Sequence, residues 1–367
     1  MRILLVSDCY LPRLGGIEVQ VDDLAHHLRE AGHDVRVATA TPGPETPGVV
    51  RLLPPVRLPV PINPWAGADL RDLMAQAEVV HVHLGIVAPF ASMAATRATR
   101  MGLPTVVTWH SMFGALTPLL RYAEPWRRWV RGGAVPTAVG RAAADQVERA
   151  TGSVAPVQVL PNGIEVADWA APAPPPGGGP VQVACAIRFA RRKRPLAVLD
   201  MVHRMRDELA GEVDVQVVVA GDGPLLAPMR EVVRRQGWAD WLHLPGRLPR
   251  PELARRYHHS HLYLSPARLE SFGIAALEAR TAGLPVAGLE GSGIGEFVED
   301  GVSGVLAPDD DALVTRVVEL VRDRPLLDRI AGHNRTTPPA QAWPAVVEAT
   351  VSTYEQARGR RAAAPRD

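Results

Sequence analysis

The stretch from Ala170 to Pro180 reads AAPAPPPGGGP and divides the sequence into two parts. A run so rich in proline and glycine fits no helix or strand interior, so we expect a linker there. On each side of it, short apolar runs of strand length alternate with segments of helical periodicity, a pattern typical of a parallel α/β sheet. The 367 residues are enough for two such domains of similar size.

The predicted organisation has five parts. A first Rossmann-like domain spans residues 1–165, the linker spans 166–180, and a second Rossmann-like domain spans 181–340. A last helix covers 341–358, and 359–367 form a disordered tail. Ligands of open parallel sheets bind at the carboxyl ends of the strands, and domain interfaces are favoured sites. We therefore expect the two domains to face each other across a cleft that holds the ligand.

The composition excludes several classes of protein. Lys+Arg 40 against Asp+Glu 39 gives a net charge of +1, which provides no global field for nucleic acid. Cys9 and Cys185 form no disulfide framework, which fits a reducing compartment. Met1–Asp8 enters a short apolar strand directly, unlike a secretory signal, and no run of about 18 apolar residues predicts a membrane span. We expect a cytoplasmic enzyme.

Cofactor and metal signatures are missing from the sequence. Neither domain has G-x-G-x-x-G after its first strand, which disfavours a nicotinamide dehydrogenase, and there is no phosphate-binding P-loop. His81 and His83 share one strand face, but no third ligand stands near them in the sequence. We therefore expect no cofactor and no metal, and we expect this histidine pair to pack at a strand end.

A first candidate site lies between Ser265 and Glu278, which reads SPARLESFGIAALE. A strand ends at Ser265, a loop carries Glu270, and Gly273 opens a helix that contains Glu278. The free N–H groups at a helix N-terminus suit a phosphate, and a glycine lets an anion approach closely. The two carboxylates suit sugar hydroxyls. The alternative is a solvated glutamate pair on an ordinary strand–helix unit.

A second candidate follows the first strand of the second domain, where residues 187–195 read IRFARRKRP. The only lysine of the chain, Lys193, falls here, although every other basic residue is an arginine. A compact ammonium beside the planar fork of Arg188 is suited to a diphosphate. The alternative is a basic surface loop or a nucleic-acid patch that also takes in the flanking Arg191, Arg192 and Arg194, although no interleaved aromatic residues support nucleic acid.

A third candidate is the loop YLPRLGGIE after the first strand of the first domain. Here Gly15 and Gly16 are expected to form a flexible turn before a helix that starts near Glu18. Two glycines can bring backbone N–H groups close to a phosphate or a sugar. Glycine pairs are common in loops, so this motif alone is weak.

These clusters, in this order, resemble the family 4 retaining glycosyltransferases, which have the two-domain GT-B architecture. The resemblance spans residues 1 to about 310, and the ordered set is far more specific than any single motif. The matching pieces are Gly15–Gly16, His110 at the end of VVTWH, PNGI at Pro161–Ile164, Arg188 and Lys193, GDGP at Gly221–Pro224, the two-glutamate motif at Glu270–Glu278, and AGLPV at Ala282–Val286.

The resemblance implies a role for each matching residue. Arg188 and Lys193 would bind the diphosphate of the donor, Glu270 the hydroxyls of the donor sugar, and Glu278 the ribose. Phe272, Gly273 and Ile274 would complete the donor site, with the last two meeting the distal phosphate through their backbone. On the acceptor side, the Gly15–Gly16 loop would lie between diphosphate and acceptor, and His110 would contact the transferred sugar.

The implied activity is the retaining transfer of a hexose from a UDP- or GDP-linked sugar to an acceptor hydroxyl. No metal takes part, and the departing phosphate oxygen takes the acceptor proton. The resemblance also implies that the last helix crosses back to the first domain. Ile187 and Glu165 depart from the family, which often has glycine and aspartate there. A GT-B epimerase or phosphorylase and a non-catalytic nucleotide-sugar-binding protein remain alternatives.

The sequence leaves the acceptor open between a small molecule and a lipid. Residues 118–133 read PLLRYAEPWRRWVRGG and mix apolar with basic side chains. Such a segment is able to touch the inner face of a membrane. The alternative is a helix that packs Trp126 and Trp129 against its own domain.

Overall fold

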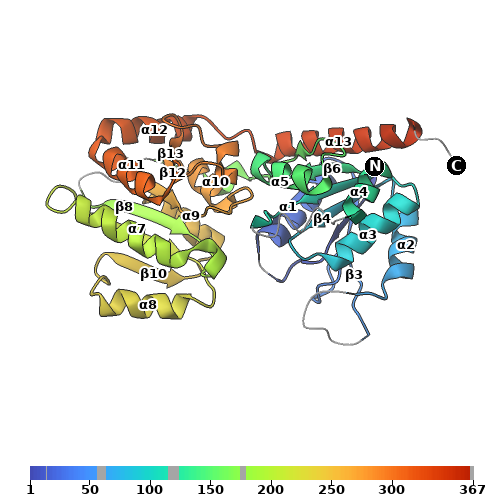
Figure 1. Cartoon of the computed structure of the whole chain (residues 1–367), viewed down its shortest axis with the longest axis horizontal. Helices are drawn as coiled ribbons and strands as arrows, with labels where there is room; N and C mark the ends of the chain where they lie inside the picture. The colour runs from blue at the N-terminus through green and yellow to red at the C-terminus, as the bar shows by residue number, and fades with distance from the viewer. Residues whose placement is uncertain (14, 56–62, 115–123, 174–178, 364–367) are drawn as a thin grey trace. The chain divides into compact units, whose positions relative to one another are not determined.

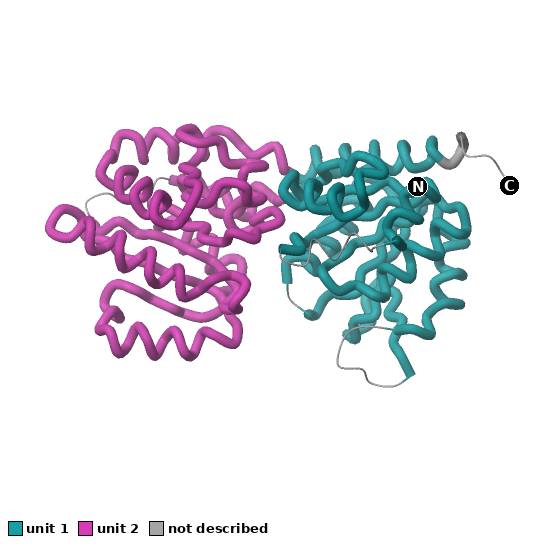
Figure 2. Tube along the Cα trace, in the orientation of Figure 1, with its two compact units in different colours: residues 1–163, 343–367 teal, residues 164–342 magenta. Residues whose placement is uncertain are grey.

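Figure 1 shows the computed structural model of the chain, which describes residues 1–13, 15–55, 63–114, 124–173 and 179–363. The chain forms two compact units, one of Met1–Gly163 with Trp343–Asp367 and one of Ile164–Ala342 (Figure 2). In the described part of the chain, no helix is both long and apolar enough to cross a membrane.

The first unit is built on a parallel sheet whose described strands run in the order β3-β2-β1-β4-β5-β6-β7. These strands are β1 Arg2–Ser7, β2 Asp34–Thr39, β3 Val49–Arg51, β4 Val79–Leu84, β5 Thr105–Trp109, β6 Val135–Ala138 and β7 Gln158–Val159. The helices are α1 Gly16–Glu30, α2 Gly67–Ala75, α3 Pro89–Arg100, α4 Glu124–Arg131, α5 Arg141–Thr151 and α13 Trp343–Ala363.

The second unit repeats this plan with a parallel sheet in the order β10-β9-β8-β11-β12-β13. Its strands are β8 Val181–Ala186, β9 Val215–Ala220, β10 Leu242–Gly246, β11 Leu262–Ser265, β12 Val286–Leu289 and β13 Gly304–Ala307. The helices are α6 Val166–Trp169, α7 Pro195–Glu208, α8 Leu226–Arg235, α9 Arg250–His258, α10 Ile274–Thr281, α11 Asp310–Arg322 and α12 Arg324–Thr336, with 3-10 turns η2 Arg191–Lys193 and η3 Gly293–Glu296.

The central strands are buried on both faces, as continuous apolar runs predict for a parallel sheet covered by helices. Every residue of β4 and β5 is buried, including His81 and His83. In each sheet the next strands of the chain lie on one side of the first strand, and the later strands lie on its other side. The order reverses between β1 and β4 and between β8 and β11, and such a switch point is where open α/β sheets bind ligands.

The C-terminal helix α13 packs on the first unit, against α1 and the strands β4, β5 and β6. Trp343 stacks on His27 with ring centroids 4.7 Å apart. Gly163 leaves room for this indole, because a Cβ there would lie 2.3 Å from Trp343 Cε3. Further along, the Tyr354 hydroxyl lies 2.8 Å from Nδ1 of the buried His81.

Two expectations about irregular segments are wrong at their edges. The linker was expected from residue 166, but 166–169 form α6, whose Trp169 is buried and accepts a hydrogen bond from His258 Nε2 on its backbone oxygen at 2.8 Å. The tail was expected from 359, but α13 continues to Ala363, and Arg360 reaches the backbone oxygen of Ala134. In both cases a hydrogen bond between a side chain and a backbone oxygen far away in the sequence holds the segment.

Candidate active site

The switch point of the second unit brings two predicted clusters together. Lys193 lies at the end of η2 after β8, and Glu270 lies in the loop after β11. Lys193 Nζ donates to Glu270 Oε2 at 2.5 Å, and both side chains are largely shielded from solvent. The two residues are 77 positions apart in the chain, and they meet because β8 and β11 are neighbours in the sheet.

Arg188 lies in the same loop as Lys193, with its side chain exposed. Its guanidinium makes no hydrogen bond or ion pair within the described residues. The backbone beside it is held by the GDGP turn, because Phe189 donates to the Asp222 oxygen at 2.9 Å and Leu225 donates to the Phe189 oxygen at 2.9 Å. Arg188 is therefore an exposed cation on a fixed loop.

Two glycines make this loop contact possible. Gly221 has φ +135, and a Cβ there would lie 1.8 Å from the Ile187 oxygen. Gly223 has φ +151, and a Cβ would lie 2.6 Å from the Phe189 oxygen. Ile187 itself does not adopt a positive φ, so a side chain is tolerated where the family often has glycine.

The Glu270 loop is held from the other side by η3. Gly293 N–H donates to the Glu270 oxygen at 2.7 Å, and Phe272 is buried against Phe297 with centroids 5.4 Å apart. Gly273, at φ +94, is the N-cap of α10, whose first residue is Ile274. The first N–H groups of a helix have no acceptor inside it, so they suit an anion at this edge of the sheet.

Glu278 lies in helix α10 and is buried. Its carboxylate and that of Glu270 both act on Tyr263 of β11. Burial raises the pKa of the Tyr263 hydroxyl well above its usual value, and these two charges raise it further. The hydroxyl also lies 3.2 Å from the Ala186 oxygen at the end of β8. Tyr263 is thus within electrostatic reach of both glutamates, a relationship that no sequence motif indicated.

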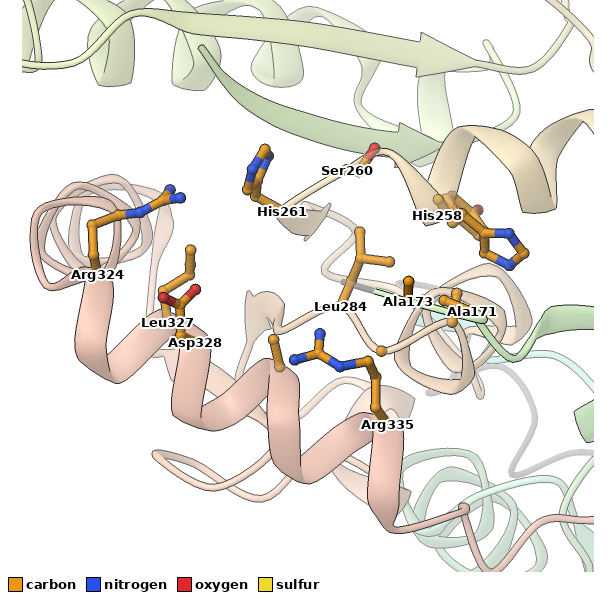
Figure 3. A pocket seen from close by; sticks show the side chains of 14 residues that line it. Ala171, Ala173, His258, Ser260, His261, Leu284, Arg324, Leu327, Asp328 and Arg335 are labelled. Carbon is orange, nitrogen blue, oxygen red and sulfur yellow. The ribbon is translucent and has the colours of Figure 1, made fainter. Parts of the chain in front are cut away.

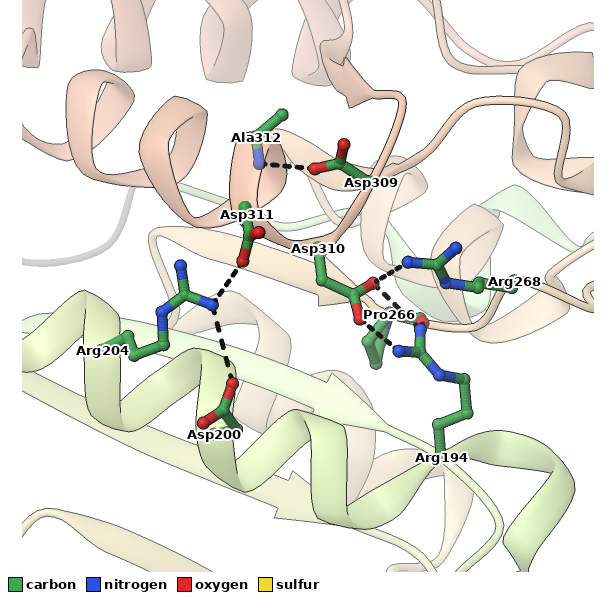
Figure 4. A network of polar contacts seen from close by, with 9 residues as sticks. All are labelled: Arg194, Asp200, Arg204, Pro266, Arg268, Asp309, Asp310, Asp311 and Ala312. Carbon is green, nitrogen blue, oxygen red and sulfur yellow. Dashed lines mark hydrogen bonds and ion pairs between the residues drawn. The ribbon is translucent and has the colours of Figure 1, made fainter.

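Arg194 is a second residue that the sequence did not single out as functional. It has φ +53, in the left-handed region, and its guanidinium forms a two-point contact with Asp310, one bond of which measures 3.0 Å (Figure 4). Arg194 also donates to the backbone oxygen of Pro266 at 3.3 Å. Arg268 lies 3.2 Å from the Asp310 carboxylate. Arg194 therefore ties the Lys193 loop to the loop that carries Glu270.

In the first unit, the predicted His110 lies beside His83. His110 Nε2 is 2.9 Å from His83 Nδ1, and the rings of His81 and His83 are also in contact, with centroids 4.1 Å apart. Burial lowers the pKa of His81 to about 3 and that of His110 to about 4, and it lowers the pKa of His83 as well. All three imidazoles are therefore neutral at pH 7.

The hydrogen bonds of His81 fix its tautomer. Thr137 Oγ1 donates to the Val107 oxygen at 3.2 Å, so it accepts from Thr108 Oγ1 at 2.5 Å. Thr108 then accepts from His81 Nε2 at 2.7 Å. His81 Nδ1 consequently accepts from the Tyr354 hydroxyl.

The proton between His83 and His110 is assigned by a similar argument. His83 Nε2 is buried and has no hydrogen-bond partner among the described residues. Buried N–H donors without an acceptor are rarer than bare acceptors, so we assign the proton of His83 to Nδ1, which donates to His110 Nε2. Neutral His110 then carries its own proton on Nδ1.

The Gly15–Gly16 prediction needs a correction. Helix α1 begins at Gly16 rather than near Glu18, and Gly15 is its N-cap in an extended conformation, so the pair is not a flexible turn. Glu18 folds back over this end, and a Cβ on Gly15 would lie 2.4 Å from Glu18 Oε2. The buried Glu18 carboxylate pairs with Arg13 at 3.2 Å. Without a side chain, Gly15 leaves room for this carboxylate.

Asp8 directly follows β1, at the point where the strand order of the first sheet reverses. Its two carboxylate oxygens accept from the N–H groups of Phe90 and Ala91 at the start of α3, both at 2.9 Å. Burial raises the pKa of Asp8 to about 6, although the two backbone donors act in the opposite direction. No sequence pattern indicated this link between loops 82 residues apart.

The tryptophans of the segment 118–133 pack into the first unit. Trp129 is buried and donates to Thr96 Oγ1 at 2.9 Å, and Trp126 contacts the ring of Trp109. Residues 118–123 lie outside the described residues. Over the described ranges, no group of three His, Cys, Asp or Glu side chains is arranged to hold a metal ion.

The comparisons with known proteins agree with this architecture. A family model described as Glycosyltransferase Family 4 matches residues 14–168, and one described as Glycosyl transferases group 1 matches residues 172–336. Together the two matches cover the strands and helices of both units apart from β1, α13 and the last residue of α6.

Two curated relatives align along most of the chain. The glycogen synthase of Mycobacterium tuberculosis is 28% identical over 412 residues, which cover 100% of this chain and 97% of the relative. A GDP-mannose-dependent alpha-(1-6)-phosphatidylinositol monomannoside mannosyltransferase of Mycolicibacterium smegmatis is 27% identical over 351 residues, 88% of this chain and 89% of the relative.

A solved structure shares the fold. The crystal structure of Anabaena Alr3699/HepE in complex with UDP superposes with a TM-score of 0.74 at 16% identity, over 97% of this chain and 100% of that chain. The expected fold class, GT-B with two Rossmann-like parallel-sheet domains, is confirmed by this likeness and by the two sheets.

Proposed function

Because the chain belongs to the family 4 glycosyltransferases and is a hexosyltransferase, we propose that it transfers a hexose from a UDP- or GDP-linked sugar to an acceptor hydroxyl with retention of anomeric configuration. The observation that carries this proposal is the Lys193–Glu270 pair at the switch point of the second unit. It places a cation and a carboxylate side by side where an open α/β sheet binds a phosphorylated ligand.

Lys193 and Arg188 would bind the donor diphosphate. The Lys193 ammonium is held by Glu270. A diphosphate offers this ammonium a doubly charged partner, and the exposed Arg188 adds a planar fork on the same loop. The backbone at Gly273 and Ile274 adds the N-terminus of α10 for the distal phosphate.

The two glutamates would bind the sugars of the donor. Glu270, at the loop, would accept hydrogen bonds from the hydroxyls of the transferred hexose, and Glu278 would hold the ribose. Phe272 supports this arrangement indirectly, because its buried ring anchors the loop between them. Arg194 and Asp310 keep the two loops in register.

The chemistry follows from where charge develops. The bond between the anomeric carbon and the phosphate oxygen breaks, and the leaving diphosphate gains negative charge that Lys193, Arg188 and the α10 N-terminus stabilise. A charge-assisted hydrogen bond contributes roughly 1.5–3 kcal/mol. The acceptor oxygen bonds to the same face of the anomeric carbon, and its proton passes to the departing phosphate oxygen. The cations occupy the place of a metal, so we propose that none is needed.

The first unit would supply the acceptor side. His110 would contact the transferred sugar, and the loop at Gly15 and Gly16 would lie between diphosphate and acceptor. The ordered hydrogen bond from His83 supports this role, because it leaves the proton of His110 on a defined nitrogen, Nδ1.

For the acceptor, we propose a small molecule or a lipid hydroxyl, with the protein in the cytoplasm and with no nucleic acid as partner. If the acceptor is a lipid, a peripheral contact at the inner membrane face would use the exposed arginines of α4, such as Arg128 and Arg131. Trp126 and Trp129 would not take part, because they pack inward.

The test is turnover of UDP-glucose, UDP-N-acetylglucosamine and GDP-mannose by the full chain, with and without EDTA. One donor is expected to release its nucleoside diphosphate, and EDTA should not change the rate. Conversion into an epimeric nucleotide sugar would point to an epimerase instead. Binding of a donor without any turnover, across an acceptor panel, would point to a binding protein.

A further inference from the structure

A pocket of about 360 Å³ lies in the second unit (Figure 3). The strand ends put it at the opposite edge of the sheet from Lys193 and Glu270. Of its lining residues, His261 comes directly before β11, and Leu284 lies two positions before the first residue of β12. They mark the amino ends of these strands, whereas Lys193 and Glu270 follow carboxyl ends. A ligand in this pocket would therefore be separate from the donor.

One face of α12 forms a wall of the pocket. The lining residues Arg324, Leu327, Asp328, Ala331 and Arg335 recur every three or four positions, so they share one helix face. Arg324 and Arg335 stand at the two ends of this face with Asp328 between them. Figure 3 shows both guanidinium groups turned toward the hollow.

The charge of these two arginines is not neutralised by the protein. In the described part of the chain, neither guanidinium has a hydrogen bond or a carboxylate within 4 Å, and Nη1 of Arg324 is buried without a partner. Elsewhere in this unit, arginines such as Arg204 and Arg322 are paired with carboxylates. Residues 174–178, which lie outside the described residues, have no acidic side chain in their sequence PPPGG.

An unpartnered guanidinium N–H away from water has a desolvation cost that a bound anion would offset. We propose that this pocket is a second ligand site, which binds a small phosphorylated polyol. The phosphate would contact a guanidinium, which suits its oxygens. The Asp328 carboxylate would accept hydrogen bonds from hydroxyls and disfavour a second phosphate. The volume lies in the range of small-molecule sites.

The test is calorimetric titration of the full chain with glucose 6-phosphate, inorganic phosphate and glucose. Arg324→Gln and Arg335→Gln should each weaken glucose 6-phosphate binding at least tenfold, and the double variant should abolish it. Arg329→Gln is the matched control, since it removes a cation from the same helix but outside the pocket lining, and it should bind like wild type. Circular dichroism and UDP binding verify that the variants are folded.

Three outcomes would overturn the proposal. In the first, glucose 6-phosphate binds the double variant as well as wild type, or binds neither. In the second, Lys193→Ala abolishes the binding and the double variant does not, which would place the ligand in the donor site. In the third, inorganic phosphate binds as tightly as glucose 6-phosphate, which would show that the site does not recognise the polyol, or glucose does, which would show that it does not recognise the phosphate.

Discussion

Lys193 Nζ and Glu270 Oε2 lie 2.5 Å apart across the point where the strand order of the second sheet reverses. The pair joins the loop after β8 to the loop after β11, and Arg194 with Asp310 forms a second tie between the same regions. An incoming diphosphate would compete with Glu270 for the lysine, so donor binding and placement of the sugar-binding carboxylate would be coupled.

Replacing Lys193 tests this pair. Lys193→Ala should lower kcat/KM by roughly ten- to a hundredfold or more, because about 1.5–3 kcal/mol of charge-assisted bonding to the leaving group is lost. Lys193→Arg should recover only part of it, since a wide, directional guanidinium cannot settle between two phosphates as a compact ammonium does. Steady-state kinetics with one confirmed donor measures both. Wild-type rates in Lys193→Arg would show that the single lysine has no special role.

Gly221→Ala should disturb the Arg188 loop. The new Cβ would overlap the Ile187 oxygen, and φ +135 is unfavourable for alanine. Gly211 is the matched control in the same unit, because it has φ +80 with no atom within 4 Å of its Cβ position. Backbone strain should lower the stability of both variants by about 1 kcal/mol, and the overlap with the Ile187 oxygen should lower that of Gly221→Ala further. Only Gly221→Ala should raise the donor KM by tenfold or more. Equal KM values in thermally stable variants would contradict the loop's role.

His83 should act as a positioning residue for His110. His83→Leu should reduce kcat more than it changes the donor KM, because the donor to His110 Nε2 is lost. His83→Asn, whose amide can replace the Nδ1 proton, should restore most of the rate. Long-range ¹⁵N–¹H spectra of the histidines report the tautomer directly: His110 should be protonated on Nδ1 in wild type and in His83→Asn. A proton on Nε2 of His110 in wild type would refute the assignment.

The buried histidines should make the first unit sensitive to acid. The folded-state pKa values of His81, His83 and His110 are depressed, so their contribution is fully present above pH 6.5 and declines as pH falls toward their folded values. Asp8 acts oppositely, since its raised pKa favours the folded state below about pH 6. The histidines outnumber it, so stability should fall between pH 6.5 and 4.5.

Urea unfolding of the first unit at several pH values measures this dependence. Each group contributes at most about 1.4 kcal/mol per pH unit. His81→Gln should flatten the dependence, whereas His26→Gln, at an exposed site on α1, should leave it unchanged. An identical slope in wild type and His81→Gln would contradict the buried neutral state.

The features visible in the sequence were those set by local pattern. Apolar runs such as Ile3–Val6 predicted buried strands, and the repeat of the pattern after the proline-rich stretch predicted two sheets. The meeting of Lys193 and Glu270 was implied only through the family resemblance, because strand order is not written in local periodicity. Short or weakly patterned elements, such as β3 at Val49–Arg51 and α2 at Gly67–Ala75, were missed.

The residues that support the site were harder to predict because their partners are distant in sequence. Arg194 looked like its neighbours Arg191 and Arg192, and only the fold shows that it binds Asp310, 116 positions away. Asp8 appeared to be a strand-end residue, and its role at the start of α3 depends on the neighbouring strand. His83 looked like half of an incomplete metal pair, and its partner His110 comes from the next strand.

The most direct test of the donor clamp is calorimetric titration of the full chain with UDP and UMP, and with GDP and GMP. We expect one diphosphate to bind at least tenfold more tightly than its monophosphate. Lys193→Ala should bring this ratio close to one, whereas Arg191→Ala, an exposed cation two residues away, should preserve it. A ratio that is unchanged in Lys193→Ala, or equal affinities for diphosphate and monophosphate in wild type, would contradict a diphosphate clamp at Lys193.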